Sequence, residues 1–399
     1  MQEIVIITQY FYPDIASTAQ LMTDLAQGLA SRNYQVKVFT SSKSGKFNFN
    51  DNFLKKVKVI QWKSNIFDDK VILGKSLNSL FFLVISSIYV FKYVHKDIPI
   101  LIVSNPPYIG IVGLLVKLFK PSNFYFVFQD IFPESAVISK IIKSGGMVYL
   151  IFSFITYLIC QKSEITITLS RSMKKLLETK YPDLNKSSIK VIENWSIEDI
   201  KILPKENNEF AIKHHLVDRF TLLYSGNIGR VHDIESIALA SYLLKDKPIN
   251  FVFIGDGYKK KILVYYQEKY KLKNIMLLPF QPRSILSQSL TACDISIVSL
   301  IEGAEKIIAP CKLYGMLASG RAILSISSSG SYIEEILHEY NCGINCPPHN
   351  PEQLAATITE LAANPERVKE MGEKSRQLYE ERYTFRRALD EYEKIIFGV

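Results

Sequence analysis

The sequence is poor in cysteine. Its five cysteines are scattered and include no Cys-x-x-Cys pair; they are Cys160, Cys293, Cys311, Cys342 and Cys346. An odd, dispersed set of this kind indicates neither a disulfide framework nor a zinc site. The N-terminus also lacks the basic region and long apolar core of a signal peptide. We therefore expect a reduced, cytoplasmic protein.

Several sequence motifs are absent as well. The chain has no Gly-x-Gly-x-x-Gly, no Walker lysine motif and no internal repeat, which disfavours a dehydrogenase or a P-loop enzyme. No Asp-x-Asp occurs, so no sequence feature asks for a metal, and we expect no metal and no other cofactor. A basic charge without any recognisable binding module also gives no reason to expect a nucleic-acid partner.

Acidic residues are scarce in the first half of the chain. Residues 1–205 hold 25 Lys and Arg against 15 Asp and Glu, a net charge of +10, whereas residues 206–399 hold 23 against 24. This excess suits anionic lipid, nucleic acid or merely a lysine-rich soluble surface. Two aromatic-rich apolar stretches bounded by lysines, at 77–94 and 147–160, favour lipid. The second is shorter than the roughly 20 residues of a membrane span. We expect helices partly in the core and partly facing a membrane, with plain buried helices as the alternative.

Length and periodicity predict two α/β domains. A chain of 399 residues with 48% hydrophobic residues can build two cores. Strands alternating with helices indicate doubly wound parallel sheets. The strands are predicted at 3–8, 36–40, 100–104, 124–128, 165–168, 220–224, 250–254, 275–278, 295–299 and 322–325. The polar stretch 205–209 is interpreted as a linker, and the tail at 352–396 is predicted to be helical.

One stretch, at 221–233, predicts an anion site. An apolar run ends at Gly226, and a helical pattern opens near Asp233. Free backbone N–H groups at a helix N-terminus attract anions, and glycines such as Gly226 and Gly229 let a phosphate approach the backbone. Arg230 adds a positive fork. A tight turn without a ligand is the alternative interpretation.

Other loops follow strands at the same sheet edges. In parallel sheets the ligand sits beyond the carboxyl ends of the strands. In the second half, Gly255 and Gly257 follow one strand, and Lys312 opens a helix after another. One anionic ligand could therefore meet Arg230 and Lys312, although Lys312 could also be a solvated lysine at a helix start. In the first half, the loops at 9–18, 105–108 and 130–134 share one predicted edge.

Short motifs in a fixed order carry a family resemblance. They are Tyr12-Pro13-Asp14 with Ser17-Thr18, Asn105-Pro106-Pro107, Asp130-Ile131-Phe132-Pro133-Glu134-Ser135, Ile192-Glu193-Asn194-Trp195, Tyr224-Ser225-Gly226-Asn227-Ile228-Gly229-Arg230, Gly255-Asp256-Gly257, and Pro310-Cys311-Lys312-Leu313-Tyr314 with Ala318-Ser319-Gly320-Arg321. In this order they resemble glycosyltransferase family 4, and particularly its fucosamine-transferase-like and exopolysaccharide branch.

The resemblance implies a fold and an activity. The fold would be GT-B, two Rossmann-like domains facing each other across a cleft. Residues 1–205 would form the acceptor and membrane side, residues 206–380 would bind the nucleotide sugar, and residues 381–399 would form a helix that packs back on the first domain. The activity would be retaining transfer of a hexose, of the glucose or N-acetylglucosamine type, from a UDP-sugar to a lipid-linked saccharide. The enzyme would serve exopolysaccharide or cell-surface polysaccharide biosynthesis, as a peripheral protein on the inner face of the cytoplasmic membrane.

The resemblance also implies roles for individual residues. The residues expected to bind the donor are Gly226, Asn227, Gly229, Arg230, Gly255, Gly257, Pro282, Arg283, Lys312 and Leu313. The residues expected on the acceptor side of the cleft are Tyr12, Ser17, Thr18 and Asn105. Asp130 would be catalytic, with Glu134 as a second candidate, and a helix or turn cap is the alternative role for Asp130.

One departure from the family concerns two glutamates separated by seven residues. Ile307 and Gly315 stand at those places. Glu302 or Glu305 could take over the contact to the donor sugar, and Tyr314 could contact the ribose or simply pack. Two other functions therefore stay open. They are a nucleotide-sugar epimerase or hydrolase, and a non-catalytic membrane-associated subunit.

Overall fold

A computed structural model describes residues 2–14, 16–42, 56–63, 66–67, 72–120, 122–196 and 199–399. The chain divides into two compact units. Unit 1 consists of Met1–Glu193, Ile307–Ala309 and Arg386–Val399, and unit 2 consists of Asn194–Lys306 and Pro310–Phe385.

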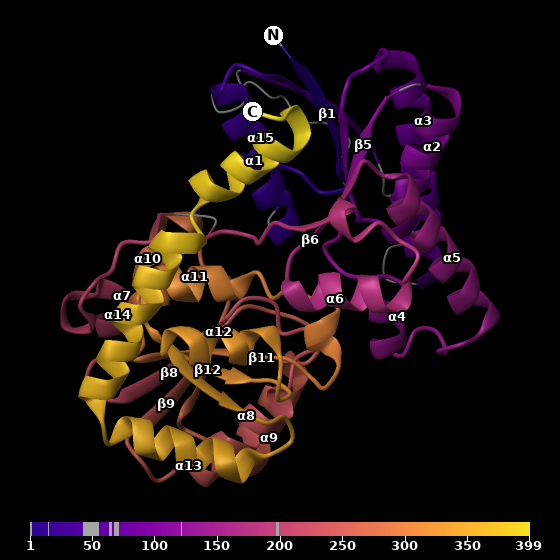
Figure 1. Ribbon diagram of the computed structural model, residues 1–399. Helices are drawn as coiled ribbons and strands as arrows, with labels where there is room; N and C mark the ends of the chain where they lie inside the picture. The colour runs from indigo at the N-terminus through magenta and orange to yellow at the C-terminus, as the bar shows by residue number, and fades with distance from the viewer. Residues whose placement is uncertain are drawn as a thin grey trace. The chain divides into compact units, whose positions relative to one another are not determined.

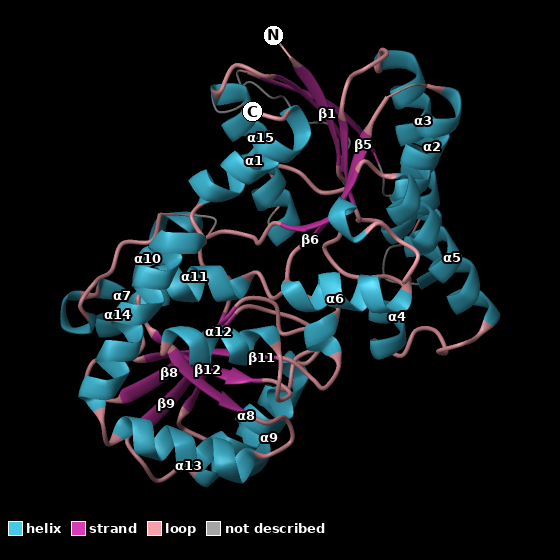
Figure 2. Cartoon of the chain, viewed as in Figure 1, coloured by secondary structure: helices cyan, strands magenta, loops and turns pink. Residues whose placement is uncertain are grey.

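Unit 1 is built on a seven-stranded sheet in the order β3-β2-β1-β4-β5-β6-β7 (Figure 2). All of its ladders are parallel. Its strands are β1 (Glu3–Ile7), β2 (Gln35–Ser42), β3 (Val57–Lys63), β4 (Ile100–Val103), β5 (Phe124–Val127), β6 (Ile165–Thr168) and β7 (Ile189–Val191). The central strands are continuous apolar runs, as expected when helices cover both faces of a parallel sheet.

The helices of unit 1 connect these strands. They are α1 (Ser17–Ser31), α2 (Ile72–Tyr93), α3 (Ile111–Phe119), α4 (Glu134–Ile138), α5 (Met147–Lys162), α6 (Arg171–Lys180) and α15 (Phe385–Phe397). The C-terminal helix α15 packs beside the end of α1, where Arg32 forms ion pairs with Asp390 and Glu393. The rings of Tyr34 and Phe397 stack there with centroids 4.1 Å apart. These contacts hold residues 386–399 on unit 1.

Unit 2 is built on a six-stranded parallel sheet in the order β10-β9-β8-β11-β12-β13. Its strands are β8 (Phe220–Ser225), β9 (Ile249–Ile254), β10 (Ile275–Leu278), β11 (Ile295–Ser299), β12 (Ala322–Ile326) and β13 (Gly343–Cys346). Its helices are α7 (Glu209–Lys213), α8 (Ile234–Leu243), α9 (Lys260–Tyr270), α10 (Leu286–Thr291), α11 (Lys312–Ala318), α12 (Tyr332–Tyr340), α13 (Pro351–Ala362) and α14 (Pro365–Arg382) (Figure 1).

Each sheet has a point where the strand order reverses. In unit 1 this point lies between β1 and β4, and in unit 2 it lies between β8 and β11. Connections from these neighbouring strands leave toward opposite faces and open a crevice at the carboxyl ends. The loops after β8 and β11 therefore mark the place in unit 2 where a ligand is most easily held.

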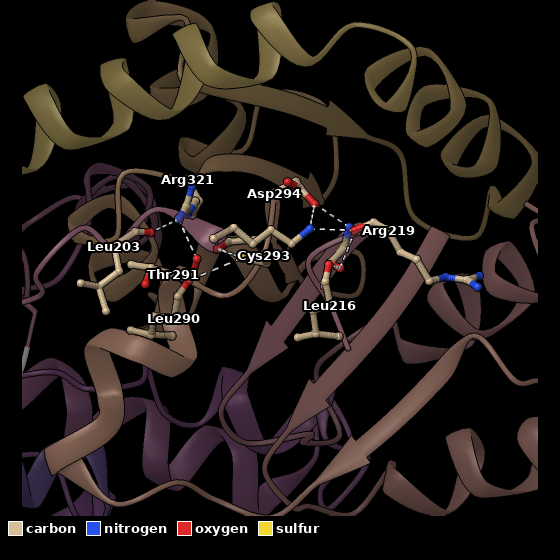
Figure 3. A network of polar contacts seen from close by, with 11 residues as sticks. Leu203, Leu216, Arg219, Leu290, Thr291, Cys293, Asp294 and Arg321 are labelled. Atoms are coloured by element: carbon tan, nitrogen blue, oxygen red, sulfur yellow. Dashed lines mark hydrogen bonds and ion pairs between the residues drawn. The ribbon is translucent and has the colours of Figure 1, made fainter. Parts of the chain in front are cut away.

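The amino-terminal ends of the unit 2 strands carry a closed polar network (Figure 3). Asp294 accepts a hydrogen bond of 2.7 Å from the Thr221 N–H and pairs with Lys205. Arg321 donates to the carbonyl oxygens of Leu203 and Thr291, at 2.7 and 2.6 Å. Because these charged groups have partners inside the network, we assign it a structural role.

The ten predicted strands are confirmed, with small shifts at their ends. Three strands were missed, namely β3, β7 and β13. β3 alternates with lysines at a sheet edge, and β7 has only three residues. The prediction of a linker at 205–209 was wrong, because Asn208 is fully buried and caps α7 within unit 2.

Candidate functional site

The loop after β8 opens toward a single side chain. Gly226 has φ of +128°, a conformation that glycine adopts without strain. A Cβ added to Gly226 would meet only Lys312, at 3.5 Å from Cε and 3.9 Å from Nζ. The bare glycine therefore leaves a small space beside the Lys312 ammonium group.

Lys312 lies against this loop from the start of α11. Its Nζ hydrogen-bonds to the Tyr224 hydroxyl and donates to the Asn227 carbonyl oxygen at 3.2 Å. The same nitrogen lies 3.8 Å from the centre of the Tyr224 ring. Lys312 forms no ion pair with any carboxylate in the described part of the chain. The side chain is half-buried, and desolvation lowers its pKa to about 7. The structure thus favours a lysine held against the loop over a fully solvated one.

Tyr224 fixes the loop and the lysine together. It is fully buried as the fifth residue of β8, and its hydroxyl donates to the Asn227 carbonyl oxygen at 3.0 Å. A hydroxyl that donates to Asn227 still has lone pairs to accept from Lys312. Sequence reasoning missed this role, because the apolar pattern of β8 shows only that Tyr224 is buried.

His232 completes the base of the loop. Its Nδ1 lies 2.6 Å from the Ser299 carbonyl oxygen at the end of β11. Desolvation, and then the charge of Lys312, lower its pKa to about 3. The imidazole is therefore neutral at physiological pH, with its Nδ1–H donating to Ser299. His232 joins β8 to β11 without adding charge, and no sequence pattern indicated this contact.

The glycines after β9 have a packing role. A Cβ on Gly255 would lie 2.1 Å from the Gly226 carbonyl oxygen, and one on Gly257 would lie 2.5 Å from that of Ile228. The Ile228 N–H also donates to the Asp256 carbonyl oxygen at 2.8 Å. The second loop thus supports the first. The requirement for glycine at 255 and 257 comes from this loop-to-loop contact.

Arg230 is the second cation beside the loop. It is exposed, and its guanidinium carbon lies 3.3 Å from the centre of the Tyr258 ring. Arg230 has no carboxylate partner among the described residues. Stacking on an aromatic face leaves its N–H donors free at the edge of the guanidinium plane. Arg230 can therefore meet an anion without first breaking an ion pair.

The remaining residues predicted to bind a donor lie in different environments. Asn227, Pro282 and Arg283 are exposed, and Gly229 is buried. The Leu313 side chain is fully buried and its N–H donates to Pro310, so Leu313 belongs to the core.

The departure from the glutamate pair is visible in the structure. Ile307 is buried, and a Cβ on Gly315 would meet only Leu290, at 3.5 Å. Glu305 is buried, and its Oε2 has no hydrogen-bond partner in the described residues. Tyr314 is buried and packs its ring edge against Tyr383, with centroids 5.3 Å apart. Of the two roles open for Tyr314, the structure shows packing.

In unit 1 the loops at the carboxyl edge are joined as the parallel sheet requires. The Gln9 N–H donates to the Asn105 carbonyl oxygen at 3.3 Å, and the Gln129 N–H donates to Ser104 Oγ at 2.8 Å. The other acceptor-side residues lie at the β1–α1 connection. The Tyr12 N–H donates to Thr23 Oγ1 of α1 at 3.1 Å, and Ser17 and Thr18 begin α1.

Asp130 lies just beyond β5. Its backbone forms an isolated antiparallel bridge with Ile308. The residue is exposed, yet desolvation by surrounding protein atoms raises the pKa of its carboxyl to about 6. The first helix after it, α4, has Pro133 at its N-cap and no side-chain cap, so Asp130 does not cap that helix.

Glu134 is engaged inside unit 1. One carboxylate oxygen, Oε1, pairs with Lys180 and accepts a hydrogen bond of 3.1 Å from the Tyr149 hydroxyl. The Lys180 ammonium also lies 4.7 Å from the centre of the Tyr149 ring. A carboxylate held this way supports α4 against α5 and α6. The structure therefore favours Asp130 over Glu134 as the group free for chemistry.

Comparison with known proteins gives a consistent family. Residues 205–378 match the family described as "Glycosyl transferases group 1". The glycosyltransferase WbjE of Pseudomonas aeruginosa is 27% identical over 295 residues, covering 73% of this chain and 72% of WbjE. The colanic acid biosynthesis glycosyl transferase WcaI of Escherichia coli K12 is 27% identical over 145 residues, 36% of each chain. Anabaena HepE, solved in complex with UDP and glucose, superposes with a TM-score of 0.75 at 13% identity, covering 100% of both chains.

Proposed function

Because the chain is a glycosyltransferase with a group 1 domain and the GT-B fold, we propose that it transfers a hexose from a UDP-sugar to a lipid-linked saccharide. Glucose and N-acetylglucosamine are the two proposed sugars. The proposed stereochemical outcome is retention of the anomeric configuration. The proposed place of action is the inner face of the cytoplasmic membrane, in the biosynthesis of a surface polysaccharide.

The observation that carries this proposal is the cation at the mouth of the Gly226 loop. Lys312 is half-buried, has lost much of its hydration and has no carboxylate partner in the described residues. A cation held in this state is stabilised by an incoming anion. It stands at the switch point between β8 and β11, next to a glycine that leaves space. A diphosphate fits this combination of charge and room.

The comparisons support particular parts of the proposal. HepE is a solved structure with UDP and glucose bound, which supports UDP as the nucleotide and glucose as one candidate sugar. WcaI is named for colanic acid biosynthesis, which supports a polysaccharide product.

The transfer reaction requires stabilisation of charge at two places, the leaving diphosphate and the sugar. The bond from the sugar C1 to the diphosphate oxygen breaks, a bond from C1 to an acceptor hydroxyl oxygen forms, and the hydroxyl proton passes to the leaving diphosphate. Lys312 and Arg230 would stabilise the negative charge that develops on the leaving diphosphate. Asp130 as a carboxylate would orient the acceptor hydroxyl or stabilise positive charge at the sugar. These two cations supply the charge that a metal would otherwise bring, so metal-independent transfer is proposed.

The acceptor class is proposed from unit 1. Its outer helices expose large apolar side chains, and its sequence carries the excess positive charge. An enzyme whose acceptor is anchored in a bilayer must work at the bilayer surface. A lipid-linked saccharide is therefore the acceptor class that this unit suits best.

The test is formation of a glycoside. Purified protein is incubated with radiolabelled UDP-glucose or UDP-N-acetylglucosamine, with EDTA, and with an organic extract of membrane lipids as acceptor. We expect label to move into the lipid fraction with one of the two donors. Loss of donor without any glycoside would instead indicate a hydrolase or an epimerase. Failure to bind either donor would indicate a non-catalytic subunit.

A further inference from the structure

Helix α2 raises a question that its sequence leaves open. Leu73–Tyr93 is long and apolar enough to cross a membrane by length and composition, and 28% of the 18-residue window that meets this criterion is buried. The same composition could mark a core helix. The pattern of burial along α2 decides between these possibilities.

One stripe of α2 faces its own unit. From Asn78 onward its buried positions recur every fourth residue, at Asn78, Phe82, Ser86 and Val90, and Val94 just beyond the helix continues the spacing. At 3.6 residues per turn, a spacing of four turns by only about 40° at each step, so these side chains form one continuous stripe that winds slowly around the helix. Such a stripe indicates a helix that lies along a protein surface.

The contacts of this stripe tie α2 to the sheet. The Trp62 ring on β3 stacks on Phe82 and Tyr89, with centroids 5.3 and 5.2 Å apart. Asn78 Oδ1 accepts hydrogen bonds from the backbone N–H groups of Ile66 and Phe67, at 3.1 and 3.0 Å. A membrane-spanning α2 would lose these contacts. We therefore exclude a span and treat α2 as a surface helix of unit 1.

The opposite side of α2 is apolar and exposed. Leu80, Val84 and Ile88 also recur every fourth residue, and each is about half exposed, at 52%, 46% and 54%. Single exposed apolar side chains are ordinary on soluble proteins, but a contiguous stripe is not. This exposed stripe is the first part of a larger surface.

Two further helices continue that surface. Helix α3 packs against both α2 and α5, and the three lie along one flank of unit 1 (Figure 1). The exposed rings of Phe91 on α2 and Phe119 on α3 meet with centroids 6.0 Å apart. On α5, Leu150, Ile151 and Phe154 are 58%, 52% and 60% exposed. We call the exposed apolar side chains of α2, α3 and α5 the apolar face.

Charge around the apolar face is mostly positive, although Glu164, just after α5, lies 3.8 Å from Lys117 on α3. Helices α2, α3 and α5 contain no Asp or Glu, and neither does the connection at 139–146. Exposed lysines border the face, among them Lys75, Lys92, Lys140 and Lys143. A second copy of the chain would bring lysines against lysines, which opposes self-association. Anionic lipid headgroups beside acyl chains match both the charge and the apolar side chains.

We propose that the apolar face docks on an anionic phospholipid bilayer, with α2 and the first half of α5 lying in the plane of the interface. Amphipathic helices bind in this way when an apolar side enters the headgroup boundary and lysines stay in water. The docking deepens the proposed function, because it brings unit 1 to the surface where a lipid-linked acceptor resides. UDP binding needs no bilayer, so the two proposals can fail separately.

The first test is sedimentation of the full chain with vesicles. One set contains phosphatidylcholine alone, and the other also contains phosphatidylglycerol. We expect binding to the anionic vesicles that weakens with added salt. The double variant Leu150→Asn with Ile151→Asn should bind roughly tenfold more weakly, because two apolar side chains no longer enter the interface.

A matched control separates docking from general loss of surface hydrophobicity. Ile212→Asn with Leu243→Asn changes one Ile and one Leu of similar exposure, 53% and 48%, on unit 2. This control should bind vesicles like the wild type, and both double variants should bind UDP like the wild type. Equal vesicle binding by the two double variants would overturn the proposal. So would a wild-type dimer that the α5 variant dissociates, since the face would then be an interface between copies.

A second test measures whether α5 inserts into the bilayer. Phe154→Trp places a fluorophore on α5, and Tyr265→Trp, of similar exposure on unit 2, is its control. The native Trp62 and Trp195 emit in every variant, so each variant is compared with the wild type. Anionic vesicles brominated in the acyl chains should quench Phe154→Trp more than the wild type and Tyr265→Trp no more than the wild type. Equal quenching at both sites would contradict insertion of α5.

Discussion

The two units share an architecture and differ in the residues that surround it. Each is a parallel sheet with one reversal of strand order. In unit 2 the loops at that reversal hold Lys312 and Arg230, neither of which forms an ion pair among the described residues. In unit 1 the candidate Glu134 is neutralised by Lys180, and the outer helices expose apolar side chains. On our proposals, the same fold serves an anionic ligand in unit 2 through the residues after its strands and a lipid surface in unit 1 through the residues on its outer helices.

The largest effect is expected from the unpaired cation of unit 2. Lys312→Ala should lower kcat/KM for the donor by roughly a hundredfold to a thousandfold, since it removes a charge aimed at the leaving group. The control is Lys247→Ala, an exposed lysine that bonds to Thr359 near the opposite end of the sheet. Steady-state kinetics measures both. Equal rates for the two variants would remove Lys312 from the site.

The next largest effect is expected on the turnover rate and not on donor binding. Asp130→Asn in unit 1 should lower kcat by roughly a hundredfold and leave UDP affinity unchanged, because its carboxylate acts on the acceptor or the sugar. A pKa of about 6 means that the carboxylate is lost as pH falls through that value. The wild-type rate should therefore fall in acid, and the variant's should not. Asp183→Asn, which changes an exposed aspartate of the same unit, is the control. If Asp130→Asn also lost UDP affinity, the claim that unit 2 alone binds the nucleotide would be contradicted.

A smaller effect is expected from the residue that positions Lys312. Tyr224→Phe keeps the ring and removes the hydroxyl that bonds to Lys312 and to Asn227. We expect UDP to bind roughly tenfold more weakly, the worth of about one hydrogen bond to a charged group. The matched control is Tyr242→Phe on α8, which also removes one hydroxyl; the Tyr242 ring packs at a tilt against Tyr270. Calorimetric titration compares the two, and equal affinities would leave Tyr224 with a packing role only.

The pH dependence of UDP binding tests whether the charge on Lys312 holds the diphosphate. The lowered pKa of Lys312 means that its charge is present below about pH 7 and is lost as pH rises through that value. Bound diphosphate favours the charged form, so affinity should fall between pH 7 and pH 9, by up to about fiftyfold if only the charged lysine binds. His232 is already neutral throughout this range. Lys312→Arg keeps its charge at pH 9 and should show a flat profile. A flat wild-type profile would contradict this account of Lys312.

The smallest effect is expected on the free energy of unfolding, when one helical glycine from each unit is replaced by alanine. A Cβ at Gly315 in α11 meets only Leu290 at ordinary contact distance, whereas one at Gly113 in α3 would lie 2.5 Å from the Phe124 ring. Gly315→Ala should raise the free energy of unfolding by about 0.5–1 kcal/mol, and Gly113→Ala should lower it by about 1–3 kcal/mol. Differential scanning calorimetry measures both. If both variants changed the free energy of unfolding in the same direction, the space around each glycine would not explain the effect of its replacement.

Much of the fold could be predicted because buried parallel strands are continuous apolar runs. The runs ending at 8, 104, 128, 224, 254 and 299 all became strands. β7 and β13 could not be found in the same way. β7 has three residues, and β13 begins with glycine and contains Asn345. Such short edge strands are defined by pairing with a neighbour, which the local sequence does not encode.

The site was predictable in its charges and not in its contacts. Gly226, Arg230 and Lys312 follow strands, so their approach could be argued from parallel topology. Tyr224 and His232 act through hydrogen bonds across β8 and β11, and these depend on strand order. The roles of Gly255 and Leu313 likewise depend on what packs against them. Sequence patterns identify residue types at a sheet edge, whereas burial and partners decide which of them face a ligand.

Calorimetric titration of UDP into the wild type and into Lys312→Ala, with EDTA present, tests the central claim most directly. The account predicts saturable binding of UDP to the wild type without metal, and loss of nearly all of that binding in a folded Lys312→Ala variant. Equal binding by both proteins, or no binding by the wild type, would contradict the claim that the Gly226 loop and Lys312 of unit 2 hold the nucleotide diphosphate.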